Sequence, residues 1–472
     1  MAERILFLTG HLAERRLRKV LTEMAPAGFD WDVRDIGIQV AALMTADLIR
    51  RRLPRAEVAA DRVLVPGYCA GDLGALAADL GRPVSRGPED LHDIPAHFGR
   101  ARLGADLSQH AVRIFAEIVD APKMSIEAIL QQARDYAAEG ADVIDLGCLP
   151  GTRFDHLEEA VAALHGAGFR VSVDSADAEE LRRGGRAGAD FIFSLSETTL
   201  ALADEMAATP VLIPARPGDL DSLCGAADAL AKKGRACILD PILDPIPFGL
   251  AASLVRYAEL RRRMPEVPIL MGIGNLTELT EADSSGVNAT LFGIIAELGI
   301  TDVLAVRKSP HCRTAIAEAD LARRIMHAAK TLGRLPVGID SGLLTLRSRK
   351  PFATTPAEIA ETAAGIRDAN FRIEVAEDGI HVYNRDGHHV ARDAFELYPR
   401  LAVAEDGAHA FYLGAELMKA QLAFELGKRY VQDEPLDWGV ALKRAPGERA
   451  AHRAPGATLQ ERRARRRNGK SK

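Results

Sequence analysis

ADVIDLG, residues 141–147, is a short apolar run that carries an aspartate near its end. Similar runs follow along the chain, namely RVSVDS at 170–175, ACILD at 236–240 and MGIGN at 271–275. Helix-length stretches separate such runs, and this alternation is typical of a parallel β/α barrel whose strand ends carry the chemistry. The polar residues at these ends are Asp145, Asp174, Asp240 and Asn275. We therefore expect the functional site at the carboxyl ends of the strands.

The whole central region follows the same pattern. Amphipathic stretches such as SIEAILQQARDYAAEG, with apolar residues three and four positions apart, alternate with the strands. A (β/α)8 barrel takes about 250 residues, which suits this region. The predicted fold is therefore α/β with a central (β/α)8 TIM barrel at residues 106–335. The eight strand candidates are, in order, VRIFAEIV, DVIDLG, RVSVDS, FIFSLS, PVLIPA, ACILD, PILMG and DVLAV.

The two flanks differ from the centre. Residues 1–105 alternate strand and helix patterns (ILFLTG, WDVRDIG, DRVLVPG), which predicts an open α/β domain with turn glycines. Residues 336–439 contain the β-rich pieces GLLTLRSR, FRIEVAEDG and IHVYNRDGHHV and then a long helix pattern, which predicts a small α+β domain. Residues 440–472 are rich in Lys and Arg, and a solvated disordered tail is favoured over nucleic-acid binding.

Composition narrows the class of protein. With 47% hydrophobic and 27% charged residues, the chain is an ordinary globular protein. No stretch approaches the roughly 20 apolar residues of a membrane span, and the start of the chain lacks the apolar core of a signal peptide. We expect a cytoplasmic location. The five cysteines are scattered and contain no C-x-x-C pair, so neither a disulfide framework nor a thiolate metal site is predicted.

Three of the strand-end residues indicate a ligand class. Asp174, Asp240 and Asn275 follow the third, sixth and seventh predicted strands, so they approach one pocket from different directions. An ionised carboxylate accepts two parallel N–H bonds, and an amide both donates and accepts. This combination suits the amino-pyrimidinone edge of a pterin.

These motifs and their order resemble the pterin-binding barrels, dihydropteroate synthase and the methyltetrahydrofolate-dependent corrinoid methyltransferases. The motifs that carry the resemblance are ADVIDLGCLPGTR, RVSVDS, GADFIFSLS, ILDPILDPIPFG and MGIGNLTE. The three-part layout resembles the dihydropteroate synthase-related proteins of methanogens and of methylotrophs that use tetrahydromethanopterin. The resemblance implies a transferase of one-carbon metabolism. Its reaction joins a hydroxymethyl-dihydropterin diphosphate to an arylamine in the biosynthesis of that folate analogue.

The resemblance also assigns roles to residues. Asp174 and Asp240 match aspartates that hold the pterin, and Asn275 matches an asparagine that contacts it in the methyltransferases. Asp145 matches the aspartate of the second strand. Arg153, together with Thr152, matches a Thr-Arg pair near the diphosphate and the arylamine.

Departures from the family pattern are equally specific. Ser194 stands near the place of a pterin-binding asparagine, and the lysine of the seventh strand is missing. Lys123, Arg153 and Arg307 follow predicted strands and are expected to supply the missing positive charge at a catalytic site. Glu117 and Asp120 are expected to hold Mg²⁺, which favours a few carboxylates plus substrate oxygens.

Alternatives remain at this point. Asp174, Asp240 and Asn275 are also suited to capping the helices that follow them. A second possible function is methyl transfer from a methylated pterin to a corrinoid, and a third is non-catalytic pterin binding. A homodimer is the expected assembly, with a pterin and an arylamine as small-molecule partners.

Overall fold

The computed structural model describes residues 3–88, 91–98 and 105–442. These residues form two compact units, of which one is the central Ala105–Leu343 with Gly439–Ala441. The other combines the described part of Met1–Gly104 with Leu344–Trp438. Most of the predicted basic tail, from residue 443 on, lies outside the described residues.

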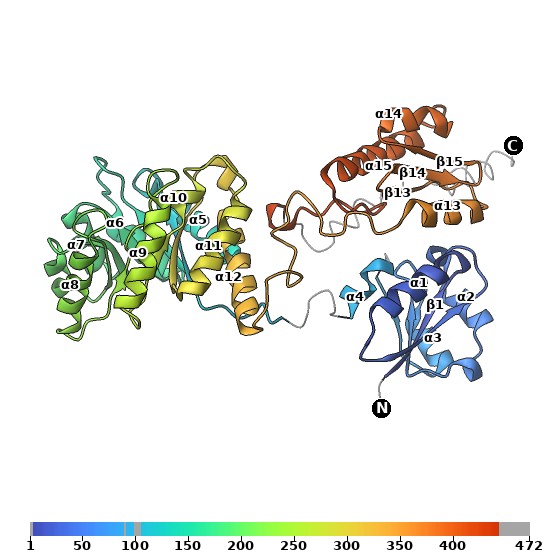
Figure 1. The fold of residues 1–472 in the computed structure, drawn as a ribbon, viewed down its shortest axis with the longest axis horizontal. Coiled ribbons are helices and arrows are strands. Elements are labelled where there is room, and N and C mark those ends of the chain that lie inside the picture. Colours follow the sequence, from blue (N-terminus) through green and yellow to red (C-terminus); the bar gives the residue numbers. More distant parts are fainter. Residues whose placement is uncertain (1–2, 89–90, 99–104, 443–472) are drawn as a thin grey trace. The chain divides into compact units, whose positions relative to one another are not determined.

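The central unit is a barrel of eight parallel strands, which confirms the predicted fold class (Figure 1). Neighbouring strands are paired in the order β10-β9-β8-β7-β6-β5-β12-β11, and a parallel bridge between Leu239 and Ile269 joins the two ends of this series. The strands are β5 (Arg113–Ile118), β6 (Val143–Gly147), β7 (Val171–Asp174), β8 (Phe191–Leu195), β9 (Thr209–Leu212), β10 (Ile238–Leu239), β11 (Leu270–Gly272) and β12 (Asp302–Val306).

Helices surround the strands, as Figure 1 shows. After β8 the connection is the 3-10 helix η5 (Leu200–Glu205) in place of an α-helix. The barrel helices are α5 (Ile126–Glu139), α6 (Leu157–Gly166), α7 (Ala178–Arg186), α8 (Leu220–Ala231), α9 (Leu250–Arg263), α10 (Gly274–Thr277), α11 (Ser284–Leu298) and α12 (Ala315–Thr331). Side-chain caps fix several of their starts; for example, Ser125 accepts a hydrogen bond from the Ala128 N–H at the start of α5.

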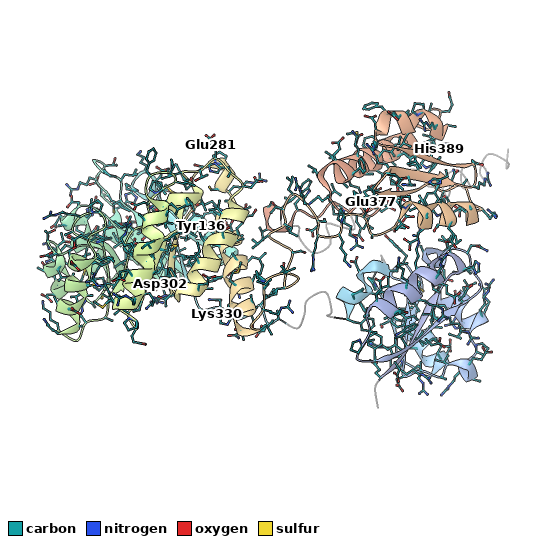
Figure 2. The ribbon with its side chains drawn as sticks, viewed as in Figure 1. Tyr136, Glu281, Asp302, Lys330, Glu377 and His389 are labelled. Atoms are coloured by element: carbon teal, nitrogen blue, oxygen red, sulfur yellow. The ribbon has the colours of Figure 1, made fainter. Side chains whose placement is uncertain are left out.

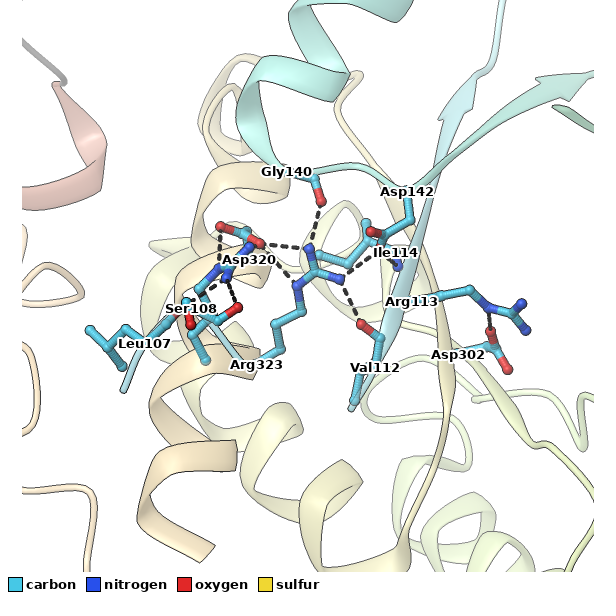
Figure 3. A network of polar contacts seen from close by, with 11 residues as sticks. Leu107, Ser108, Val112, Arg113, Ile114, Gly140, Asp142, Asp302, Asp320 and Arg323 are labelled. Carbon is cyan, nitrogen blue, oxygen red and sulfur yellow. Dashed lines mark hydrogen bonds and ion pairs between the residues drawn. The ribbon is translucent and has the colours of Figure 1, made fainter. Parts of the chain in front are cut away.

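The amino-terminal end of the barrel is held by a buried arginine. Arg323 of α12 is 3% exposed and donates to the carbonyl oxygens of Val112 and Gly140 and to the carboxylates of Asp142 and Asp320 (Figure 3). This single guanidinium therefore ties α12 to the chain just before β5 and β6. Features at this face of a barrel serve stability, whereas chemistry belongs to the opposite face.

The other unit contains an open parallel sheet with strand order β2-β1-β3-β4. Its strands are β1 (Arg4–Thr9), β2 (Asp30–Asp35), β3 (Arg62–Val65) and β4 (Val84–Arg86). Its helices are α1 (His11–Glu23), α2 (Ala46–Arg52), α3 (Leu73–Leu80) and α4 (Ile94–His97). A 3-10 turn at Ala41–Leu43 precedes α2, and the Thr45 side chain caps α2 by accepting a hydrogen bond from the Leu48 N–H.

The later part of this unit is an antiparallel three-stranded sheet with helices. GLLTLRSR, predicted as β-rich, forms no strand in the described chain, and its backbone bonds instead to the chain after α15, where the Ser348 N–H donates to the Gly427 carbonyl. The elements are α13 (Pro356–Gly365), β13 (Arg372–Ala376), β14 (Gly379–Asn384), β15 (Gly387–Ala391), α14 (Ala394–Leu397) and α15 (Gly407–Leu426).

Ion pairs join the two parts of this unit. Arg15 and Lys19 of α1 bind Glu361 and Glu358 of α13, at 2.7 and 2.8 Å. Arg16 of the same helix binds Glu374 on β13 at 3.3 Å. The early and late segments of the chain therefore pack against each other within one unit.

Candidate functional site at the carboxyl end of the barrel

The interior of the barrel has two layers of side chains. An apolar layer lies in the middle of the barrel, and an acidic layer lies above it, nearer the carboxyl ends of the strands. Side chains two residues apart on a strand point to the same side. Glu117 therefore lies above Phe115, and Asp240 lies above Ile238. Asp174 shares the inner side of β7 with Ser172 in the same way. The lower layer is a cluster of Phe115, Val143, Phe191, Phe193, Val211, Ile238, Leu270 and Leu304, drawn from seven of the eight strands.

Two of the acids are held by serines from the neighbouring strand. Ser172 donates to Oδ1 of Asp145 at 2.5 Å, and Ser194 donates to Oδ1 of Asp174 at 2.7 Å. Ser194 adopts a left-handed backbone conformation, with φ of 63°, at an irregularity in the pairing of β8 with β9. This irregularity redirects the chain at the point where Ser194 reaches Asp174. Oδ2 of Asp145 is buried and has no hydrogen-bond partner within the described chain.

Asp240 is fixed by the loop and the helix that follow it. Its Oδ1 accepts from the Ile242 N–H at 2.8 Å and from the Tyr257 hydroxyl at 3.1 Å. Arg256, next to Tyr257 on α9, donates to the carbonyls of Pro241 and Ile242 and so holds the same loop. These contacts leave Oδ2 of Asp240 without a partner among the residues described.

Asn275 is attached to this same loop. Its Nδ2 donates to the Leu243 carbonyl at 2.9 Å, and its side chain is otherwise exposed at the start of α10. The structure therefore brings Asp145 and Asp240 each within electrostatic reach of Asp174 and connects Asn275 to the loop after Asp240. Neither Asp174 nor Asp240 caps a helix in the structure; Asp177 caps α7, and Gly249 precedes α9.

Glu117 joins this group from β5. It is paired in register with Asp145, and its carboxylate leans over Gly147, where an added Cβ would lie 2.5 Å from Oε1. Gly147 therefore leaves room for this carboxylate. Burial raises the pKa of Glu117 to about 7, with further contributions from the charges of Asp174 and Glu278.

The aspartates are also easier to protonate than usual. Burial raises the pKa of Asp240 to about 6, although the Ile242 N–H and the Tyr257 hydroxyl oppose the shift. Burial, followed by the charges of Asp174 and Glu117, raises the pKa of Asp145 well above its ordinary value. Burial raises the pKa of Asp174 against the hydrogen bond from Ser194. Raised carboxyl pKa values favour a ligand that brings N–H donors or positive charge.

The loop cations are mostly engaged by acids. Arg307 pairs with Glu139, and its guanidinium carbon lies 4.7 Å from the centre of the Tyr136 ring. Tyr136 lies within the barrel unit (Figure 2). Arg153 is exposed and pairs with Asp155 at 2.9 Å. Lys123 is exposed in the turn after β5.

The expected Mg²⁺ ligands are not arranged as a complete site. Asp120 pairs with Lys308, whereas Glu117 interacts with Asp145 and Asp174. Within the described residues, three metal-ligating side chains with mutually close donor atoms occur only at His11, Glu14 and Asp35, which are at the surface of the other unit. Glu117 and Asp120 would need oxygens from a substrate to complete a magnesium shell.

Sequence reasoning overlooked Tyr257, Arg256 and Gly147. Tyr257 is fully buried and Arg256 is largely buried on α9, so their roles depend on how α9 packs beneath the loop after β10. The available signal was Gly147 two residues after Asp145, because a glycine on an inner strand position permits close approach of a neighbouring group.

Comparisons with known sequences give two findings. Residues 3–89 match the model of a family of unknown function, DUF6513. An uncharacterised protein of Methanocaldococcus jannaschii is 26% identical over 521 aligned positions, which cover 91% of this chain and 98% of that protein. The described helices include none with the length and apolar composition needed to cross a membrane.

Among solved structures, similar chains include two dihydropteroate synthases. The enzyme from Vibrio fischeri has a TM-score of 0.37 and 18% identity, and the match covers 47% of this chain and 93% of that one. The enzyme from Yersinia pestis, solved with a sulfonamide drug complex, has a TM-score of 0.37 and 20% identity, covering 48% and 96%.

Proposed function

We propose that the barrel unit binds a pterin at its acidic inner layer and acts as a pterin-dependent transferase. The observation that carries the proposal is the arrangement of Asp145, Asp174 and Asp240. Each uses Oδ1 to hold a structural donor, and the described chain supplies no partner for the three Oδ2 atoms. Oδ2 of Asp145 is fully buried, whereas Asp174 and Asp240 are partly exposed, so the Oδ2 atoms of Asp174 and Asp240 are the acceptors offered to a flat heterocycle whose edge carries amino and ring N–H groups.

The sequence motifs support a more specific reaction. In that reaction an arylamine nitrogen attacks the methylene carbon of a hydroxymethyl-dihydropterin diphosphate. A C–N bond forms, the C–O bond to diphosphate breaks, and the arylamine nitrogen loses a proton. The expected product is a precursor of tetrahydromethanopterin. Positioning of the two substrates provides most of the rate in such a step.

The departing diphosphate requires positive charge. Lys123 is the one predicted catalytic cation that has no acid partner within the described chain, and Arg153 has only an exposed partner, so we assign these two to the diphosphate. Arg307 is occupied by Glu139 and is not assigned a contact. Glu117 and Asp120 would hold Mg²⁺ together with substrate oxygens, and the proposed attack and release of diphosphate do not require this ion.

Methyl transfer to a corrinoid is the second candidate. It is favoured by the pairing of Arg307 and Lys308 with acids, because a methylated pterin needs no cations for a leaving diphosphate. A spectral change on mixing methyl-pterin, reduced cobalamin and the protein would support methyl transfer. Arylamine-dependent release of diphosphate would support the synthase reaction.

Calorimetry with a pterin and with its hydroxymethyl diphosphate tests the common proposal. Asp174→Asn or Asp240→Asn replaces an accepting oxygen by a donor, so each should cost about 1.5–3 kcal/mol, or a roughly ten- to hundred-fold weaker Kd. Asp221→Asn, at an exposed carboxylate of α8, is the matched control and should bind normally. Failure of the wild-type protein to bind any pterin would contradict the proposal. Binding without turnover of any arylamine would indicate a non-catalytic pterin-binding protein.

A further inference from the structure

The unit that contains the open sheet has a cavity of about 270 Å³. It lies at the carboxyl ends of β1 and β3, where Thr9, Val65 and Pro66 line it. In the strand order, β2 lies next to β1 at one edge, and β3 lies next to β1 in the opposite direction. The direction of the connections therefore reverses between β1 and β3. Ligands of open α/β sheets bind outside the strand ends at such a switch.

The lining of this cavity is mostly apolar and contains no carboxylate among its described residues. Two arginines, Arg16 and Arg372, reach it, but both already bind acids. Arg16 binds Glu374, and Arg372 makes two parallel bonds to Asp368 at 2.8 and 3.0 Å. The charges around the cavity are therefore balanced before any ligand enters. Apolar side chains that line it include Phe7, Leu8, Leu12, Leu17, Leu64 and Ile366.

The start of α1 is closed to a phosphate. The N–H groups of His11 and Leu12 donate to the carbonyls of Ile38 and Gln39, at 2.7 and 3.1 Å. Gly10, which precedes the helix, is so close to this segment that an added Cβ would lie 2.8 Å from the Ala41 nitrogen. The usual phosphate site of such folds, the free N–H groups at a helix start, is thus occupied by the chain itself.

We propose that this cavity binds a neutral, mainly apolar small molecule about the size of one or two fused rings. The apolar walls and the volume set the size and the chemistry, because small-molecule sites are mostly apolar with a few polar groups that fix orientation. Beside the two arginines, the polar groups of the lining are the hydroxyls of Thr9, Tyr68, Thr362 and Tyr383, of which Thr9 donates to the Gly10 carbonyl. The site is independent of the acidic layer of the barrel.

The cavity wall comes from both parts of the unit. Thr362 and Ile366 near α13, and Tyr383 of β14, line it together with α1 and β1. A bound molecule contacts both parts, so binding should raise the melting temperature of this unit.

Fluorescence of N-phenyl-1-naphthylamine, a neutral probe, tests the proposal in the full chain. Ala13→Phe on α1 and Ala42→Phe fill the cavity and should weaken the Kd for the probe at least tenfold. Ala42 is exposed on one side, so its variant should fold even if Ala13→Phe does not. Ala78→Phe, on the exposed side of α3 and away from the cavity, is the control and should bind like the wild type.

Anilinonaphthalene sulfonate, an anionic probe of similar size, tests the charge. It should bind at least tenfold more weakly than the neutral probe. Equal binding of the neutral probe by both filled variants and the wild type would overturn the proposal, as would tighter binding of the anion. Displacement of the neutral probe by a pterin would also overturn it, because the probe would then be reporting the barrel site.

Discussion

Asp145 is under more constraint than the other acids of the barrel. It is fully buried, Ser172 holds one of its oxygens, and the other has no partner among the described residues. A buried acceptor without a donor costs about 1–3 kcal/mol. Such exceptions in a folded protein call for an explanation, and protonation of this carboxyl, whose pKa burial raises well above its ordinary value, lowers the cost.

Glu117 should make the stability of the free protein depend on pH. Its pKa in the folded state is raised to about 7 from its ordinary value of 4.5, so the folded protein holds this proton more tightly than the unfolded chain does. Stability should therefore fall as pH rises between about 4.5 and 7. Glu117→Gln removes the effect and should stabilise the protein at pH 8 by up to about 3 kcal/mol, with little change at pH 4. Urea unfolding at both pH values measures it.

Glu281→Gln is the matched control for this prediction. Glu281 is exposed in the loop before α11 and is labelled in Figure 2. Its variant should follow the wild-type dependence on pH. An equal effect of the two substitutions would contradict a raised pKa of Glu117 in the folded protein.

Sequence patterns located the acids of the site better than their partners. Asp145, Asp174 and Asp240 could be predicted to converge because parallel strands end at one face of a barrel. Their donors could not be predicted as readily. The position of Ser194 depends on a local irregularity of β8, and that of Tyr257 depends on the packing of α9, which distant residues determine.

Most helices and strands whose apolar residues recur at a regular spacing were predicted, and elements without such a spacing were not. The eight barrel strands were recognised although β10 contains only Ile238–Leu239, because their apolar runs repeat at similar intervals. The 3-10 helix after β8 and the absence of a strand in GLLTLRSR were not foreseen. Helix α13 was overlooked although Thr355 and Glu358 form a capping box at its start, a signal that is visible in the sequence.

The network around Arg323 should contribute to the stability of the barrel unit by holding α12. Arg323→Met leaves the carboxylates of Asp142 and Asp320 without this buried partner. Loss of one member of a fully buried ion pair costs about 3–5 kcal/mol, and the loss here should be smaller because both carboxylates are partly exposed and Asp320 keeps Arg324. We expect a lower melting temperature of the barrel unit, measured by calorimetry. Arg262→Met, on the exposed side of α9, is the control and should change stability by about 0.5 kcal/mol or less. Equal losses in the two variants would contradict this account.

The whole chain should unfold in two steps, because each unit has its own hydrophobic cores. A pterin at 100 times its Kd should stabilise the barrel unit by about 2.7 kcal/mol and leave the other transition unchanged. N-phenyl-1-naphthylamine should shift only that other transition. Scanning calorimetry with each compound measures both effects, and a single transition that both compounds shift would contradict the independence of the two sites.

One unit is assembled from segments that precede and follow the barrel in the sequence. Its folding during synthesis is therefore incomplete until the barrel has been translated. At about 5–20 residues per second, the ribosome needs on the order of ten seconds or more to translate the intervening barrel. Throughout that interval the first sheet lacks the segment that bears Thr362 and Tyr383, and part of its apolar surface stays uncovered. The nascent chain is therefore most exposed to chaperones and proteases while the barrel itself is emerging.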